Sequence, residues 1–525
     1  MRLFARCIVG IALAAWASVA SAGSWAVVGL ADGQSSANSP PGPIAPAVVE
    51  LTLGNPVRAV QELPPCAPVP ACIPFGAAAS NPGMFAAGLD GRRAYQVDRS
   101  FDAGVDGEIV EIDVPARSYG RRLSLPGMSG ATIATHPLRP LLVGVGVGAT
   151  GRQVVLVDTE TFEVANSVDM PAADAGDVGS PVSAVPVFSP DGAYVFVGTG
   201  NRIYKLDARD GRVVGVRVTG FPVAPRFDPW RSWIWTVDGE GGRVHAYRAD
   251  TLEPVLELAR WSLPLDITIA DGGRIVITRY PEDDESEFSS YPLIESVDLT
   301  GASLWKFPLP SGFHFYPGGP SKYLYLRIGG GFVEYAAVDF GVRQQWSVGS
   351  KRTTDIAFLP AIAQAVEFYN ATRDHYFLTA DDDEIDALDQ GAFAGWQRTG
   401  ESFKVTRSDA ATSGADIPVC RFYGLPERGL DSHFYTASQA ECDAVEHGYD
   451  GAWLKERADA FYVVRANETT GACPEGTAPV YRLWNARFDS NHRYTTSKAI
   501  KAEMVARGYV PEGSGPEKVA FCARS

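Results

Sequence analysis

Three histidines in the last third of the chain stand at nearly equal intervals and could share one chemical task. His375, His433 and His492 lie 58 and 59 residues apart, and aromatic residues and a threonine follow each of them. An imidazole can bind a metal ion or meet a sugar hydroxyl, so three imidazoles around one axis would form a common site. The alternative is that each histidine satisfies a backbone carbonyl in its own copy, and repetition at equivalent positions favours that structural role.

A large aromatic residue follows later in each copy, namely Trp396, Trp453 and Tyr509. Such rings are stacking platforms for sugars when they are exposed and core residues when they are buried, and the core role is favoured here. The candidate ligand-binding residues are these three aromatic residues and the three histidines. The sequence contains no zincin helix motif, nucleophile elbow or phosphate-binding glycine loop, so we assign no catalytic, cofactor-binding or metal-binding residue.

All six candidates belong to a unit that occurs three times, at approximately 366–405, 418–464 and 479–523. Each copy opens on an aromatic pair, continues through a short helical stretch and closes on a phenylalanine. Acids at 381–384 mark one helix start, and a capping box at 438–441 predicts a helix over 442–447. Copies this small cannot bury their own apolar faces, which predicts a pseudo-threefold, β-trefoil-like domain over 361–525 with one short helix per repeat.

A different motif recurs between residues 23 and 360, a short apolar strand that ends in a turn with Pro, Asp or Gly. It occurs at 84–91, 131–137, 185–192, 224–229, 266–272, 313–318 and 355–360. The mean step is about 45 residues, the length of one propeller blade. Segment 24–63 lacks a first strand, so the strand at 355–360 should complete that blade and close the ring. The fold class is thus mainly β, with a seven-bladed β-propeller before the threefold domain.

Segments of both regions resemble known families. Residues 157–163 and 188–198 resemble the YVTN-type propellers of exported bacterial proteins. That resemblance implies a propeller but no single activity, since lactonases occur among such proteins. A lactonase rim would need His, Glu and Arg together, whereas His136, His245 and His314 lie in different blades.

The C-terminal copies resemble a repeat module that is appended to secreted bacterial and fungal proteins and is catalogued as a domain of unknown function. The resemblance covers residues 366–523 and is carried by segments 418–423, 432–436, 479–485, 491–495 and 519–522. It implies an accessory binding role and leaves the ligand open.

The first 22 residues have the pattern of an export signal, with a basic start, an apolar run and small residues before a cleavage site. No stretch approaches the roughly 20 apolar residues that a membrane span needs. The formal net charge is −16 without a basic cluster, which argues against nucleic acid and anionic membranes as partners. We therefore expect an exported protein, periplasmic or secreted, with no cofactor and no membrane insertion.

Six cysteines remain after that signal, an even number that predicts disulfides in an oxidising compartment. They are Cys66, Cys72, Cys420, Cys442, Cys473 and Cys522. The first two bracket a short loop, the next two belong to the second copy, and the last two bracket the third copy. We expect a bridge within each of these pairs. No pair has the two-residue spacing of a zinc knuckle, so zinc is the weaker alternative.

These observations favour a non-catalytic binding protein. The C-terminal module is expected to recognise an extracellular glycan or a cell-wall polymer, and the propeller to bind a second partner such as a protein. One alternative is a lactonase-like hydrolase that acts at a propeller rim. The other is a structural or assembly protein of the envelope.

Overall fold

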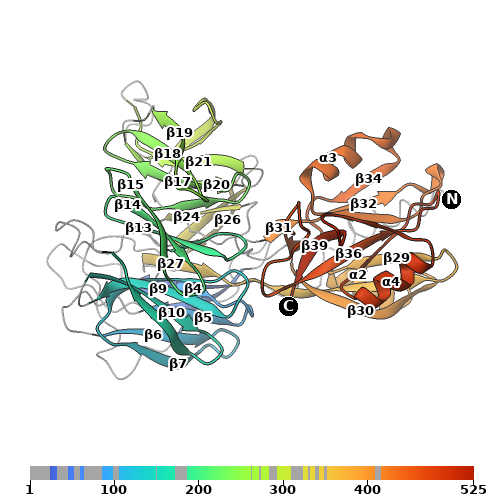
Figure 1. Ribbon diagram of the computed structural model, residues 1–525, viewed down its shortest axis with the longest axis horizontal. Coiled ribbons are helices and arrows are strands. Elements are labelled where there is room, and N and C mark those ends of the chain that lie inside the picture. The colour runs from blue at the N-terminus through green and yellow to red at the C-terminus, as the bar shows by residue number, and fades with distance from the viewer. Residues whose placement is uncertain are drawn as a thin grey trace.

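The structure of this protein, a computed structural model, consists almost wholly of β-strands (Figure 1). It describes residues 24–31, 45–51, 60–63, 85–97, 106–148, 151–171, 186–259, 261, 263–270, 273–282, 292–308, 323–328, 331–336, 342–347, 352–407 and 416–525. Within these ranges the chain forms a ring of antiparallel sheets and then a second β region that carries the α-helices. No helix in the described part of the chain is long and apolar enough to cross a bilayer.

Seven sheets make up the ring, which confirms the predicted seven-bladed β-propeller. Blade 1 contains β27 (Arg352–Phe358), β1 (Ser24–Ala31), β2 (Ala45–Leu51) and β3 (Val60–Glu62). Blade 2 contains β4 (Phe85–Ala87), β5 (Arg93–Val97), β6 (Gly107–Asp113) and β7 (Ser118–Leu125). Blade 3 contains β8 (Ser129–Thr135), β9 (Leu141–Gly148), β10 (Gly151–Asp158) and β11 (Glu163–Asp169). Blade 4 contains β12 (Val187–Phe188), β13 (Tyr194–Thr199), β14 (Arg202–Asp207) and β15 (Val213–Val218).

The remaining blades continue in chain order. Blade 5 contains β16 (Arg226–Asp228), β17 (Trp233–Asp238), β18 (Arg243–Arg248) and β19 (Pro254–Ala259). Blade 6 contains β20 (Pro264–Ala270), β21 (Arg274–Arg279), β22 (Leu293–Val297) and β23 (Ser303–Pro308). Blade 7 contains β24 (Tyr323–Ile328), β25 (Gly331–Ala336) and β26 (Val342–Ser347). The first strand predicted for blade 7, at 313–318, lies outside the described residues.

A strand from the far end of the propeller region closes the ring. β27 pairs antiparallel with β1, and Phe358 faces Ala26 in that pairing. The first blade therefore combines one strand from residues 352–358 with three strands from residues 24–62, as the sequence predicted. This shared sheet joins the two ends of the propeller and leaves no open edge between the first and last blades.

Aspartates at the ends of the third strands hold the turns that follow them. The Asp158 carboxylate accepts hydrogen bonds from the backbone N–H groups of Glu160 and Thr161 at 2.8 and 3.0 Å. Asp298 accepts one from the N–H of Thr300 at 2.8 Å in the same way. An aspartate favours a tight turn because its short side chain hydrogen-bonds the backbone two residues later.

The C-terminal module contains three copies of one unit, as predicted. The first has β28 (Ile362–Asn370), β29 (His375–Thr379), α2 (Asp382–Asp389) and β30 (Trp396–Thr406). The second has β31 (Asp416–Pro418), β32 (Cys420–Gly424), η3 (Pro426–Arg428), β33 (His433–Thr436), α3 (Gln439–His447), η4 (Tyr449–Gly451), β34 (Trp453–Arg457) and β35 (Tyr462–Val464). The third has β36 (Thr477–Trp484), β37 (His492–Thr495), α4 (Lys498–Ala506), β38 (Val510–Glu512) and β39 (Val519–Arg524).

The recurring threonine prepares the start of each helix. In the second copy, the N–H of Ser438 donates to Thr436 Oγ1 at 3.0 Å, and Ser438 Oγ accepts from the N–H of Glu441 at 3.3 Å. The helix begins at Gln439, three residues earlier than predicted, because the predicted capping box is itself the first turn. The threonine satisfies the Ser438 N–H, so the Glu441 carboxylate is available for a partner outside its own helix.

Closing residues of all three copies meet in one core. Phe403, Phe461 and Phe521 are at most 7% exposed, and the ring of Phe521 lies 6.3 and 6.5 Å from the other two. The same cluster contains one small or β-branched residue from the start of each copy. It also contains the residue that directly precedes each recurring threonine. Burial of these apolar side chains, each of which contributes about 1.5–3 kcal/mol when fully buried, holds the copies together.

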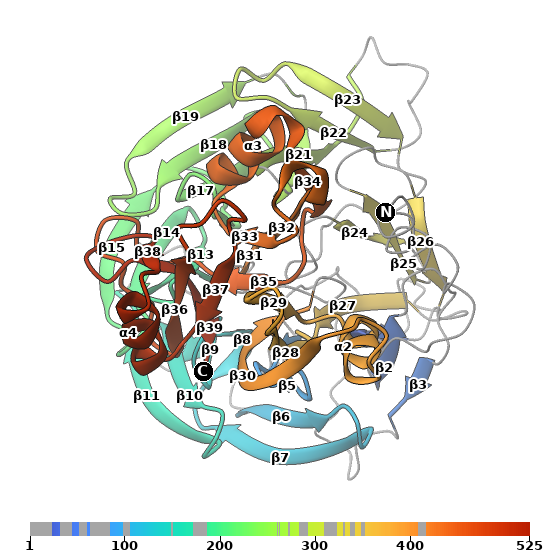
Figure 2. The ribbon, with the colours of Figure 1, turned by 90° about the vertical axis from the view of Figure 1, so that its right-hand side faces the viewer.

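The module lies against one face of the propeller ring (Figures 1 and 2). The chain enters it directly after β27, and a turn of blade 3 after β8 inserts Leu138 among buried residues of the module. Arg524 also donates to the Pro137 carbonyl at 3.0 Å. β27 and β8 are both first strands of their blades, so their C-terminal ends reach the same face of the ring.

Candidate ligand-binding surface of the C-terminal module

The three histidines do not occupy equivalent positions. In the second and third copies, His433 and His492 face the second residue of the opening aromatic pair across the hairpin. In the first copy Tyr376 has that place, and His375 lies one residue earlier. The interpretation of the three histidines as one repeated set is therefore wrong for the first copy, because strand register and not sequence spacing decides equivalence.

His433 and His492 are built into the framework beside a glutamate of their own copy. His433 Nε2 lies 3.4 Å from Glu456 Oε2, and His492 Nε2 lies 3.4 Å from Glu512 Oε2. Burial lowers the pKa of His492, although the neighbouring Glu512 acts in the opposite direction. With their side chains 16% and 7% exposed, neither ring presents a free face to a ligand.

Each of these glutamates also contacts an arginine that joins its copy to the preceding one. Arg421 Nε lies 2.9 Å from Glu456 Oε2, and both terminal nitrogens of Arg421 donate to Glu384 of α2 at 2.8 Å. Burial alone would raise the pKa of Glu384, but the Arg421 charge lowers it to about 2. The third copy repeats the arrangement with Arg482, Glu512 and Glu441.

At the boundary between the third and first copies, the acidic and basic partners of the ion pair are exchanged. Glu367 stands on the first opening strand where the other copies have arginine, and Ile500 stands on α4 where the other helices have glutamate. Arg493 closes this boundary from the third copy and donates to the Glu367 carboxylate at 3.0 and 2.9 Å. The acid therefore comes from the first copy and the arginine from the third, and this ion pair still joins the two copies.

Two edge-to-face ring contacts and one guanidinium–ring contact join the copies at the next layer. The contacts are Phe377 with His433 at 4.6 Å, Phe434 with His492 at 5.0 Å, and Arg493 with Tyr376 at 4.4 Å. A narrow space on the axis, lined in part by Glu367, Tyr435 and His492, has no volume for a water-sized molecule. Within the described ranges, no three His, Cys, Asp or Glu side chains gather as metal ligands would. The axis is a packed framework.

His375 has a separate role that joins all three copies. Its Nδ1 donates to the Asp431 carbonyl of the second copy at 3.0 Å, and its Nε2 lies 3.1 Å from Asp489 Oδ2 of the third. Both ring nitrogens face acceptor oxygens, so His375 links its own copy to the second and third copies. Burial acts to raise the pKa of Asp489, but its bonds to His375 and to nearby polar groups lower it.

Two of the three candidate aromatic residues pack within their own copies, whereas Tyr509 packs in a cluster that also contains Tyr376 of the first copy. Trp396 is half-buried against a cluster that includes Phe368 of β28. Trp453 is half-buried in the corresponding cluster of the second copy, and Tyr509 is only 6% exposed. All three residues therefore take part in packed clusters of the module.

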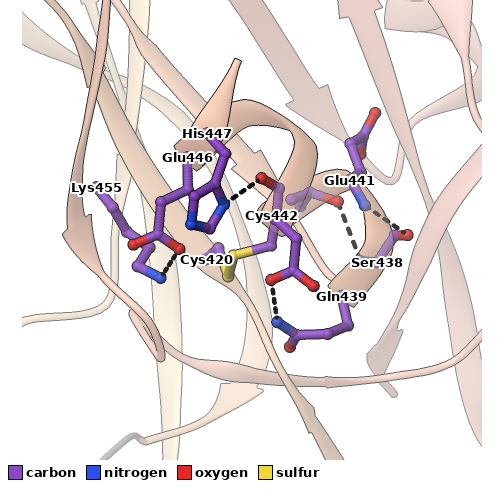
Figure 3. Close-up of a disulfide and its surroundings, with 10 residues drawn as sticks. Cys420, Ser438, Gln439, Glu441, Cys442, Glu446, His447 and Lys455 are labelled. Atoms are coloured by element: carbon purple, nitrogen blue, oxygen red, sulfur yellow. Dashed lines mark hydrogen bonds and ion pairs between the residues drawn. A yellow bond between two sulfur atoms is a disulfide. The ribbon is translucent and has the colours of Figure 1, made fainter. Parts of the chain in front are cut away.

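Two of the three expected disulfides lie in the described chain and are confirmed. Cys420 joins Cys442 of α3, and the helix around this bridge is held by its Ser438 cap and by contacts among its own side chains (Figure 3). Cys473 joins Cys522 and fastens the last strand. The predicted bridge between Cys66 and Cys72 falls outside the described residues.

Two exposed aromatic residues elsewhere on the module were not among the candidates predicted from the sequence. Phe488 is 82% exposed and Tyr449 is 68% exposed, the two highest values among the described large hydrophobic residues. Both adjoin the loop 425–431 of the second copy, which has no counterpart of equal length in the others. We call Tyr449, Phe488 and this loop the aromatic surface.

Polar groups of fixed orientation surround Phe488. Its neighbour Arg487 lies 2.6 Å from Asp374 Oδ2 and 3.2 Å from Asp489 Oδ1. Arg507 contacts the same Asp374 at 3.4 Å. These arginine and aspartate side chains are 31–41% exposed, so they remain accessible at the rim of the ring while they hold each other in place.

A signal for this surface was present in the sequence. Phe488 interrupts the otherwise polar turn between two strands of the third copy, and the loop 425–431 is one of the places where the copies differ. Positions that repeat in all copies build the framework, and positions that differ are available for a ligand. The candidates selected for their repetition are therefore the buried ones.

The described histidines of the propeller serve packing. His136 Nδ1 accepts hydrogen bonds from the N–H groups of Leu138 and Arg139, each at 3.0 Å, so Nε2 carries the proton and donates to the Gly192 carbonyl at 2.9 Å. Burial, aided by the Arg139 charge, lowers the pKa of His136 to about 4. His245 stacks on Phe221 with ring centroids 4.7 Å apart.

Comparison with family models gives a match over the C-terminal module. Residues 364–519 match a family model described as a domain of unknown function, DUF5648. No curated protein matches this sequence. The YVTN type of the propeller stays a prediction.

Among solved structures, the chain is similar to two candidate 6-phosphogluconolactonases. The protein from Bacteroides uniformis is 15% identical, with 64% of this chain and 100% of that chain covered and a TM-score of 0.43. The protein from Bacteroides fragilis is 14% identical, with 65% and 99% covered and a TM-score of 0.43. The WD40 domain of Toxoplasma gondii coronin is 11% identical, with 54% and 72% covered and a TM-score of 0.39.

Proposed function

We propose that this chain is an exported, non-catalytic binding protein whose C-terminal module binds a glycan or cell-wall polymer at the aromatic surface. Phe488 carries the proposal, because this aromatic residue remains 82% exposed although its ring lies against Gly429 of the loop 425–431. Its removal from water on binding a ligand would be favourable. The propeller is proposed to bind a second partner.

A glycan suits this surface better than an apolar ligand. Sugars present C–H faces that pack on aromatic rings and hydroxyl edges that need hydrogen-bond donors and acceptors. Beside Phe488, Arg487 offers donors and Asp489 offers acceptors, and each is already held by a partner. Groups that are oriented before the ligand arrives lose little conformational entropy on binding.

Export is supported by two separate features. The first 22 residues have the composition of a signal. The bridges Cys420–Cys442 and Cys473–Cys522 need an oxidising compartment to form and persist.

The test is a binding screen with the full mature chain, because Leu138 and Arg524 couple the module to the propeller. The protein is applied to immobilised polysaccharides and peptidoglycan, and the retained fraction is measured for the wild type and Phe488→Ala. We expect retention on at least one polymer and its loss in the variant. Retention on none of a broad panel would refute the proposal.

A further inference from the structure

Tyr449 is the second exposed ring of the module, and its backbone is strained. Tyr449, Asp450 and Gly451 have φ values of 53°, 49° and 69°, so three successive residues are left-handed and two of them carry a Cβ. Such a conformation costs of order 1–2 kcal/mol for each non-glycine residue. This strained turn carries Tyr449, which is 68% exposed, so packing does not require the tyrosine.

The loop 425–431 holds this turn in place. The N–H of Leu425 donates to the Ala452 carbonyl at 2.9 Å, and Arg428 donates to the Asp450 carbonyl at 3.2 Å. The turn is therefore fixed by two contacts from the loop. Its tyrosine has a defined position on the surface of the second copy.

The same loop also contacts the other exposed ring. Gly429 has a φ of 82°, and a Cβ at this position would lie 2.4 Å from Cε1 of Phe488. Only glycine allows the loop to approach the ring this closely. The loop thus links Tyr449 of the second copy to Phe488 of the third, with the Arg428 side chain on the tyrosine side and Gly429 on the phenylalanine side.

Within the described residues of the module, no other copy shows this arrangement. The third copy passes directly from Gly508 to Tyr509 and has no such turn, and the first copy connects its hairpin through only residues 371–374. A feature that the framework needed would recur with the framework. We infer that Tyr449 and Phe488 are two subsites of one binding surface, and that its ligand is a chain of several sugar residues lying across the second and third copies.

This inference rests on the proposed function and adds the class of glycan to it. Two rings linked by one loop, with polar groups beside Phe488, match a chain that presents alternating C–H faces and hydroxyl edges, whereas a single terminal sugar would use one ring. Binding should then strengthen as the chain lengthens, because a longer ligand reaches the second ring without a second loss of translational freedom.

The experiment titrates the full mature chain with β-1,4-linked N-acetylglucosamine and glucose oligomers, from monosaccharide to hexasaccharide. We expect the hexasaccharide of the preferred series to bind at least about tenfold more tightly than the monosaccharide. Tyr449→Ala should remove most of that gain, so that affinity rises little with chain length. Phe488→Ala should weaken binding at every length.

A second variant separates loss of the ring from loss of the fold. Tyr449→Gly also removes the ring, but glycine tolerates the left-handed φ, so this variant should keep the melting temperature of the wild type or raise it. It should nevertheless show the same flat length dependence as Tyr449→Ala. Binding that does not depend on length, or wild-type length dependence in both Tyr449 variants, overturns the inference alone. Absence of binding at any length, together with failure of the polymer screen, overturns the proposed function as well.

Discussion

Arg421 of the second copy donates two parallel hydrogen bonds, each 2.8 Å long, to Glu384 on the helix of the first copy. The side chain of Arg421 is 8% exposed, so this bond lies largely out of water and joins consecutive copies. The same bond recurs one copy later between Arg482 and Glu441. Buried, bidentate pairs of this kind determine how the copies fit together.

Removal of Arg421 should destabilise the protein strongly. Arg421→Ala leaves Glu384 and Glu456 without their shared partner, and an uncompensated buried charge costs about 3–5 kcal/mol. Urea unfolding followed by fluorescence measures the loss. Arg398→Ala is the matched control, because Arg398 makes an equally bidentate pair with Asp389 on the surface, where solvent screens the attraction. Equal effects of the two substitutions would contradict a special role for the buried pair.

The same pair predicts a loss of stability in acid. Because Arg421 lowers the pKa of Glu384 to about 2, the folded protein holds this carboxylate ionised where the unfolded chain, with a pKa of about 4.5, binds a proton. The contribution is complete above pH 4.5 and disappears as the pH falls towards 2, with an upper value of about 3 kcal/mol. Glu384→Gln should flatten the stability curve in this window. An unchanged slope in the variant would rule out Glu384 as the source.

The buried His136 predicts a second loss of stability, at a less acidic pH. Burial lowers its pKa to about 4, whereas an unfolded histidine titrates near 6.5, so protonation favours the unfolded chain. Stability should be complete above pH 6.5 and fall by up to about 3 kcal/mol as the pH drops to 4. His136→Gln should remove this slope while Glu384→Gln retains it. Identical slopes between pH 6.5 and 4 in the wild type and His136→Gln would count against the assignment.

Loop length orders the two disulfides by their effect on stability. Cys473 and Cys522 are 49 residues apart and Cys420 and Cys442 are 22 apart, so their bridges should contribute about 4 and about 3 kcal/mol through the unfolded state. Paired Cys→Ser variants avoid stray thiols, and thermal melting ranks them. Non-reducing peptide mapping of the mature chain should detect no free thiol, including at Cys66 and Cys72. A free thiol at the latter two would contradict the predicted third bridge.

The sequence predicted the architecture more fully than the site. Strand alternation and turn residues indicated seven blades, and the unpaired strand at 355–360 indicated how the ring closes, because both signals are local. The three histidines were wrongly taken as equivalent, because His375 lies four residues before Thr379 whereas His433 lies three residues before Thr436. Counting back from the threonines would have shown the shift. The pairing of Glu384 with Arg421 joins two copies, and no local pattern shows which residues of separate copies meet.

The proposed glycan binding depends most on Phe488 as the ligand-binding ring. The most direct measurement is isothermal titration of the full mature chain with the polymer it retains, for the wild type, Phe488→Ala and Phe307→Ala. Phe307 is a matched control, because this phenylalanine is 44% exposed on the outer strand β23 of the propeller. We predict that Phe488→Ala weakens binding at least about tenfold while its melting temperature is unchanged. We predict wild-type affinity for Phe307→Ala, whereas wild-type affinity for Phe488→Ala would contradict the account.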